Sequence, residues 1–93
     1  MSHFILTYGY HDTPERASRR PEHLEHLAKL QASGALLLAG PLADLSGGVI
    51  VLSAPDLEAA QALVEQDPYT RHGVTKDRDL KEWKITVGLT DHT

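Results

Sequence analysis

The order of strand-like and helix-like patterns constrains the fold of this chain more than any other feature of the sequence. Every even-numbered position of residues 3–10 is aliphatic or aromatic, and this period of two predicts a strand. A helical pattern follows, with Pro14 in its expected first turn and a restart at Pro21. Gly34 is a typical helix C-cap. The first part of the chain therefore predicts a strand followed by an interrupted helix.

The helical segment after Pro21 has an apolar stripe at helical spacing. Leu24, Leu27 and Ala28 define this stripe, and Leu30 widens it. We expect the stripe to face the protein interior. The opposite, solvated face is expected to carry Glu22, Glu25, His26 and Lys29.

The rest of the chain reads strand, strand, helix, strand. We expect strands at residues 35–39, 49–53 and 80–88, a helix that ends at residue 66 and one more turn at residues 69–72. Gly40-Pro41 should end the second strand. Ser53 and Asp56 fit a capping box for the helix, and Asp67-Pro68 should break it. A bulge near Lys81 would bring Leu80 into phase with the last strand.

The complete order, βαββαβ, is the ferredoxin-like split βαβ pattern. It predicts an α+β fold with a four-stranded antiparallel sheet in the strand order 4-1-3-2 and two helices on one face. Ninety-three residues are enough for one domain and not for two, so we assign residues 1–93 to a single domain with a core at about residues 2–88.

Two of the expected strands lack the alternation of a half-exposed sheet. Residues 36–39 and 49–52 are apolar at every position, which indicates that both of their faces are buried. The two helices cover one face only, so a second copy of the chain is the expected cover for the other. We therefore predict a homodimer packed sheet to sheet. The alternative is a monomer with an exposed aliphatic patch.

The charge balance and the cysteine count exclude some classes of partner. The net charge is −4, from 9 basic and 13 acidic residues, which disfavours binding to nucleic acid. No apolar run is long enough for a membrane span, so no membrane partner is expected. The chain has no cysteine, and its first residues lack a basic stretch. Both features favour a cytoplasmic location.

The topology brings His23 and Asp67 to the same end of the fold. Tracing the chain up and down the expected elements gathers there the end of the first strand, the start of the long helix and the end of the second helix. A histidine beside a carboxylate handles protons, because the carboxylate fixes its tautomer. The alternatives are a semi-buried structural histidine for His23 and a helix-ending Asp-Pro turn for Asp67.

Other residues at this end are candidate substrate contacts. Arg20 is either a solvated charge or a fork for a substrate carboxylate or phenolate, and Arg16 is a weaker candidate on the same face. The remaining candidates, each with a simpler structural role as turn, loop or core residue, are Gly40, Pro41, Ser46 and Tyr69. Tyr8 and Trp83 are more typical of core or dimer contacts.

No metal or cofactor is expected. The chain has six histidines, but His23 and His26 with the neighbouring Glu22 and Glu25 do not form a recognised ligand spacing. No glycine-rich phosphate motif and no nucleophile elbow occur. The expected partners are therefore a second copy of the chain and a small-molecule ligand.

Four short motifs in the same order carry a family resemblance. They are RPEHL at residues 20–24, GALLLAGP at 34–41, DPY at 67–69 and GV at 73–74. With these motifs the chain resembles the YciI-like (YCII-related) family over nearly its whole length. The resemblance implies a ferredoxin-like dimeric α+β barrel fold and a site centred on His23 and Asp67. One branch of the family is associated with dehydrochlorination of a chlorinated hydroxyhydroquinone, but the short loop at residues 42–46 departs from longer members beside the site.

The leading hypothesis is a small dimeric enzyme that moves a proton on a small organic substrate without a cofactor. His23, held by Asp67, would be the acid or base of a lyase or isomerase, and Arg20 would stabilise an anionic group. A non-catalytic small-molecule binding module and a structural dimerisation domain are the alternatives.

Overall fold

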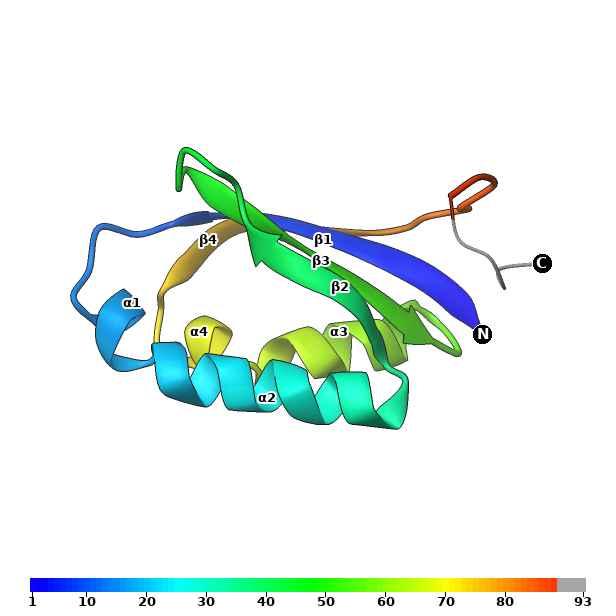
Figure 1. Ribbon diagram of the computed structural model, residues 1–93, viewed down its shortest axis with the longest axis horizontal. Coiled ribbons are helices and arrows are strands. Elements are labelled where there is room, and N and C mark those ends of the chain that lie inside the picture. The colour runs from blue at the N-terminus through cyan, green and yellow to red at the C-terminus, as the bar shows by residue number, and fades with distance from the viewer. Residues whose placement is uncertain (89–93) are drawn as a thin grey trace.

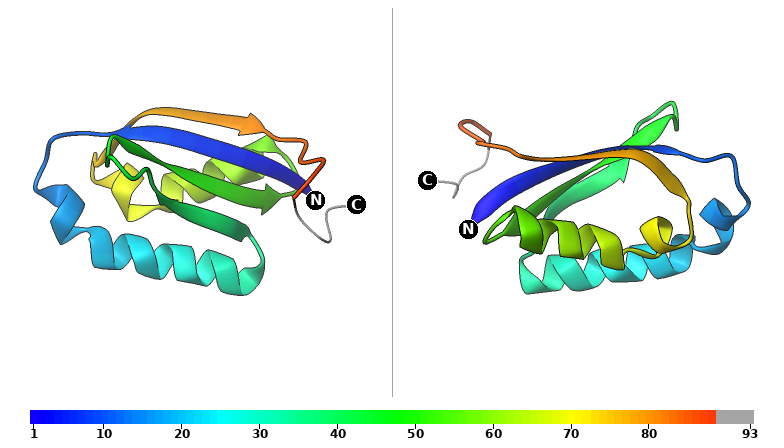
Figure 2. Two further views of the ribbon diagram at one scale, coloured as in Figure 1. Left: turned by 45° about the horizontal axis from the view of Figure 1, so that its top comes forward. Right: turned by 180° about the vertical axis from the view of Figure 1, so that it is seen from behind.

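Four antiparallel strands form one sheet in the order β2-β3-β1-β4, which confirms the predicted strand order. The computed structural model describes residues 1–88, and all helices lie on one face of the sheet (Figure 1). The two turned views of Figure 2 also show the other face without a helix. The elements are β1 (Ser2–Tyr10), α1 (Glu15–Ser18), α2 (Arg20–Ser33), β2 (Leu36–Pro41), β3 (Gly47–Ala54), α3 (Leu57–Gln66), α4 (Pro68–Arg71) and β4 (Thr75–Glu82).

The helices begin and end at residues whose chemistry explains their positions. Gly34 ends α2 in the left-handed region, with φ 84°, where a side chain would be strained. The Asp56 carboxylate accepts the Ala59 N–H at 2.8 Å and so caps α3. Asp67 separates α3 from α4 and caps the second of them. The Gly34 cap and the break at Asp67-Pro68 agree with the sequence predictions, but the capping box does not, because Asp56 is the N-cap of α3 and Ser53 lies in β3.

The core lies between the sheet and α3. Phe4 and Leu6 from β1, Ile50 and Leu52 from β3, and Val64 from α3 are all at most 5% exposed. The even-numbered positions of β1 therefore share one face, as predicted, and this face meets the helices. Within the described residues, no helix is long and apolar enough to cross a membrane.

The orientation of α2 about its axis differs from the prediction. His23 is buried, whereas Leu24 is 44% exposed and Ala28 is exposed. Leu27 and Leu30 pack against the core, as expected, and His26 is half-buried rather than solvated. The reason is that His23 contacts a buried partner at the α3–α4 junction, and this contact sets the rotation of α2 about its axis.

The prediction of a last strand at residues 80–88 is wrong. Strand β4 ends at Glu82, and beyond it the Trp83 N–H donates to the His3 carbonyl at 2.8 Å. Because β4 is an edge strand with mostly exposed side chains, its polar sequence carries no apolar alternation. The bulge lies at Asp77 and Arg78, opposite Tyr8, rather than near Lys81.

Strand β2 also extends beyond its predicted end. It includes Gly40 and Pro41, which were expected to stop it. Strand β2 is the other edge of the sheet, where a residue without an N–H donor is tolerated.

The face of the sheet away from the helices is apolar near its centre. The alternation along β1 and β3 turns Ile5, Val49 and Val51 to this face. Val51 is 2% exposed, and Leu38, its partner on β2, is 56% exposed. The fully apolar pattern of β3 thus corresponds to a strand with buried residues on both faces, whereas β2 is largely exposed in the single chain.

Candidate functional site

His23 and Asp67 meet beneath the sheet. His23 Nδ1 lies 2.8 Å from one Asp67 carboxylate oxygen and 3.0 Å from the other. His23 is 7% exposed and Asp67 is 5% exposed, so the pair is shielded from water. Such a contact is a strong hydrogen bond, because a desolvated carboxylate has no competing solvent donors.

The hydrogen bonds assign the histidine tautomer. A carboxylate only accepts, so Nδ1 carries a proton and donates it to Asp67. In the neutral ring Nε2 is then the basic nitrogen. Among the described residues Nε2 has no hydrogen-bond partner, and it is not a fully enclosed atom. It is therefore open to the cavity that His23 lines.

Tyr69 ties the pair to the rest of the site. Its N–H donates to Asp67 Oδ1 at 2.9 Å, and its ring is stacked on the His23 ring, with centroids 3.8 Å apart and an interplanar angle of 2°. Its hydroxyl donates to the Arg16 carbonyl at 3.0 Å. Tyr69 thus contacts both the His23 ring and α1.

The cavity beside His23 has a volume of about 240 Å³. This is below the ~300–1,000 Å³ typical of ligand sites, which suits a molecule of about one ring. Its lining consists of Tyr8, Tyr10, Arg16, Arg20, His23, Leu24, Leu27, Ala39, Gly40, Pro41 and Tyr69. The residues predicted as site contacts therefore come together, with Asp67 behind His23 and with one exception.

The exception is Ser46. Its hydroxyl donates to Asp44 at 2.7 Å on an exposed loop, and the residue is not part of the cavity lining. The short loop orders itself through this local contact instead of reaching the cavity.

Tyr8 and Tyr10 line the cavity although neither was a candidate site residue, and Tyr8 was expected as a core or dimer contact. The signal for them was their place at the end of the first strand, the end of the fold where His23 was expected. Their rings pack edge to face, with centroids 5.6 Å apart. Because a residue on the core face can also line a cavity, the alternation alone did not separate the two roles.

The family model of the YCII-related domain matches residues 1–84 of this chain. The chain belongs to the YCII-related family. This membership confirms the resemblance noted in the sequence.

Three proteins illustrate what this YCII-related chain is similar to. Protein YciI of Escherichia coli O6:H1 is 36% identical over 80 residues, which cover 75% of this chain and 82% of that protein. The solved structure of 5-chloro-2-hydroxyhydroquinone dehydrochlorinase (TftG) from Burkholderia phenoliruptrix AC1100, in complex with 2,5-dihydroxybenzoquinone, has a TM-score of 0.72 at 24% identity. The match covers 89% of this chain and 95% of the TftG chain.

A putative antibiotic biosynthesis monooxygenase from Deinococcus radiodurans has a TM-score of 0.55 at 15% identity, covering 97% of both chains. The two structures establish the ferredoxin-like fold of the dimeric α+β barrel type for this YCII-related chain.

The phenol of Tyr8 stays protonated in this YCII-related domain. Burial, and then the neighbouring Tyr10, raise the pKa of Tyr8 well above its ordinary value of 10.0. Burial also raises the pKa of Tyr69, although Arg16 and Arg20 act in the opposite direction. Tyr8 therefore lines the cavity as a neutral phenol.

We expect the stability of the protein to fall as the pH rises above about 10, because Tyr8 ionises in the unfolded chain before it ionises in the folded one. The folded pKa is raised, so the stabilisation is complete below pH 10 and is lost towards the folded pKa. Tyr8→Phe should make this loss less steep. Chemical denaturation across the alkaline range, with tyrosinate absorbance as a second signal, measures it. An unchanged slope in the variant would contradict the assignment.

Within residues 1–88 no group of three or more His, Cys, Asp or Glu side chains is arranged to hold a metal ion. No three of the five histidines in this range of the YCII-related chain converge. His26 is an example, since its Nε2 is enclosed and has no hydrogen-bond partner among these residues.

Proposed function

We propose that this protein is a cofactor-independent acid–base enzyme of the lyase or isomerase type that acts on a small organic anion. The observation that carries the proposal is the orientation of His23, with Nδ1 held by Asp67 and Nε2 open to the cavity. The TftG structure, a dehydrochlorinase of the same fold, supports it as a chemical precedent.

The proposed reaction begins with proton abstraction. His23 Nε2 takes a proton from a substrate carbon next to a carbonyl group, and the electron pair moves onto the carbonyl oxygen. The Arg20 guanidinium stabilises the enolate charge. In an elimination the pair returns to expel a leaving group from the neighbouring carbon. In an isomerisation the imidazolium returns the proton to a different carbon.

Asp67 keeps the proton on Nδ1 throughout, so that Nε2 is available as the base. Its carboxylate also stabilises the imidazolium that forms. Tyr69 holds the imidazole ring in plane by stacking on it. The role of Asp67 and Tyr69 is therefore to position His23, whereas His23 contacts the reacting atoms.

The test is turnover of a panel of hydroxyquinones, chlorinated hydroxyhydroquinones and 2-oxo acids. Chloride release and ¹H NMR of deuterium uptake at carbon are the two readouts. His23→Gln should abolish both, and His72→Gln, an exposed histidine away from the cavity, should abolish neither. Full activity of His23→Gln would refute the mechanism. Saturable binding without turnover of any compound would favour the binding-module alternative.

We also propose that two copies pack through the open sheet face in a two-fold, self-complementary interface. The half-buried Ile5 and Val49 and the exposed Leu38 leave apolar surface on this face, and the helices occupy only the opposite face. An apolar patch at the middle of a sheet, with polar residues on the edge strand β4, is typical of an interface core and rim.

Leu38→Lys should convert the dimer into a folded monomer. The new charge would be buried unpaired in the interface, whereas in the single chain Leu38 is 56% exposed and tolerates lysine. Leu57→Lys is the matched control, because Leu57 is 53% exposed on α3, away from the open sheet face. Sedimentation velocity distinguishes the two variants. A wild-type monomer at micromolar concentration would overturn the proposal.

A further inference from the structure

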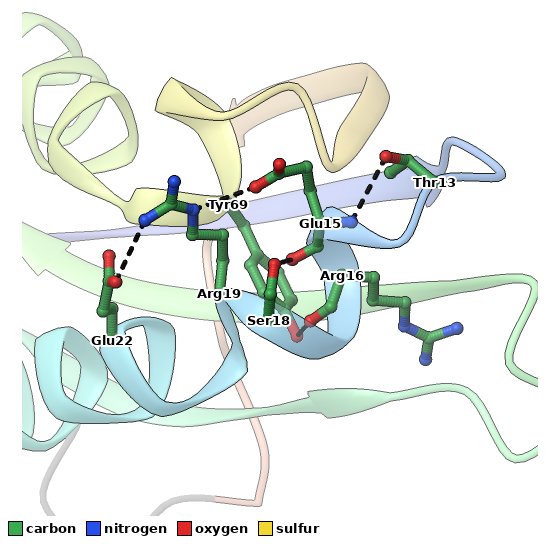
Figure 3. A network of polar contacts seen from close by, with 7 residues as sticks. All are labelled: Thr13, Glu15, Arg16, Ser18, Arg19, Glu22 and Tyr69. Atoms are coloured by element: carbon green, nitrogen blue, oxygen red, sulfur yellow. Dashed lines mark hydrogen bonds and ion pairs between the residues drawn. The ribbon is translucent and has the colours of Figure 1, made fainter.

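The turn between α1 and α2 carries three arginines that differ in whether carboxylates neutralise them. Arg19 bonds Glu15 at 2.9 Å and Glu22 at 3.2 Å. Figure 3 shows it between these two carboxylates, with the side chain of Arg16 extending away from both. Neither Arg16 nor Arg20 forms an ion pair with a carboxylate in the described part of the chain.

The two unpaired arginines share one cavity. They are four positions apart in the sequence, and both line the space beside His23. The same pair lines the adjoining open cleft of about 570 Å³. The arrangement thus places two positive charges at the entrance to the candidate base.

Arg16 is held in place from two sides. Its guanidinium carbon lies 3.8 Å from the centroid of the Tyr10 ring, a cation–π contact, and its carbonyl accepts the Tyr69 hydroxyl. A guanidinium stacked on a ring keeps its N–H donors free in its own plane. Arg16 can therefore donate hydrogen bonds to an anionic group while its guanidinium stays packed on the Tyr10 ring.

The charges of the cavity lining are not balanced by the protein. The lining contains no carboxylate, and the nearby Asp67 is already bonded to His23. Asp12 lines only the outer cleft and makes no ion pair with either arginine. Two unpaired cations in a chain of net charge −4 point to a ligand that supplies the missing negative charge.

We infer that the cavity selects an organic dianion of about one ring, with one anionic group on Arg16 and the second on Arg20. Each guanidinium is a fork that matches one carboxylate or enolate group. The tyrosines supply an apolar wall for the ring between the two groups. The inference rests on the proposed function, because it names the substrate class of the same site.

The test compares benzoate with phthalate and terephthalate, which share the ring and differ by one carboxylate. Isothermal titration calorimetry at low salt should show at least one dicarboxylate binding about tenfold more tightly than benzoate. Arg16→Gln and Arg20→Gln should each bring the ratio of dicarboxylate affinity to benzoate affinity close to one. Arg19→Gln, which removes an equal charge from the neutralised position, should leave the ratio unchanged.

A ratio that is the same in Arg16→Gln and Arg19→Gln, or the absence of measurable binding of all three acids, would overturn the inference. Neither result depends on turnover. If His23→Gln abolishes turnover of the panel while the ratio is insensitive to Arg16, the dianion preference fails and the proposed function stands. If the ratio behaves as expected and no compound of the panel turns over, the dianion preference stands and the proposed function fails.

Discussion

Asp67→Asn should move the proton on the His23 ring from Nδ1 to Nε2 and so remove the base. The asparagine oxygen can still accept the Tyr69 N–H, as Asp67 does at 2.9 Å. Its amide nitrogen then takes the place of Oδ2, 3.0 Å from His23 Nδ1, and its N–H favours an unprotonated Nδ1. Turnover should fall by roughly 10²–10⁴-fold, the range that general acid–base catalysis contributes.

The tautomer can be measured without a substrate. Long-range ¹H–¹⁵N NMR distinguishes the protonated from the bare ring nitrogen, and the expected result is an exchange of the two signals. Asp44→Asn is the matched control, because Asp44 bonds only Ser46 on an exposed loop. A variant that keeps the proton on Nδ1 would show that Asp67 does not set the tautomer.

Gly47→Ala should be among the most destabilising single substitutions in the chain. A Cβ at Gly47 would overlap the Tyr8 carbonyl oxygen, a backbone atom that cannot move without disturbing the β1–β3 pairing. The expected loss of unfolding free energy is about 2–3 kcal/mol, as for overpacking in a core. In a domain of this size such a loss lowers Tm by roughly 10 °C.

Two neighbouring glycines make this prediction specific. A Cβ at Gly40 meets no atom within 4 Å, so Gly40→Ala should fold with nearly wild-type stability. At Gly48 the Cβ would overlap the Tyr8 hydroxyl, so Gly48→Ala should displace that side chain in the cavity and cost less than Gly47→Ala. Thermal and urea unfolding of the three variants compares them. Equal stability of Gly47→Ala and Gly40→Ala would show that the strands adjust freely.

The elements with local chemical signals were predictable from the sequence. The left-handed Gly34 and the Asp67-Pro68 break each act within a few residues, so their effect does not depend on the rest of the fold. The position of β4 was not predictable in this way. Its backbone pairs with β1 while its side chains are mostly exposed, and an edge strand needs no apolar alternation.

The candidate site was likewise predictable only in part. The strand order placed His23 and Asp67 at one end of the fold, because connections between antiparallel elements fix which ends meet. Whether their side chains touch depends on the rotation of α2 and on the turn at Asp67. Ser46 was misplaced because its hydroxyl has a closer partner in Asp44.

The order of the elements, the strand order and the end of the fold that carries the candidate site thus follow from sequence patterns alone. The three-dimensional packing was needed to decide that His23, rather than Leu24 or Ala28, faces inward. It also decided that Arg16 and Arg20 face the cavity while Arg19 is neutralised outside it. The physical reason is that the rotation of a helix about its axis is set by the side-chain contacts that most stabilise the folded state. The decisive contact joins His23 to a carboxylate 44 residues away, beyond the range of any local pattern.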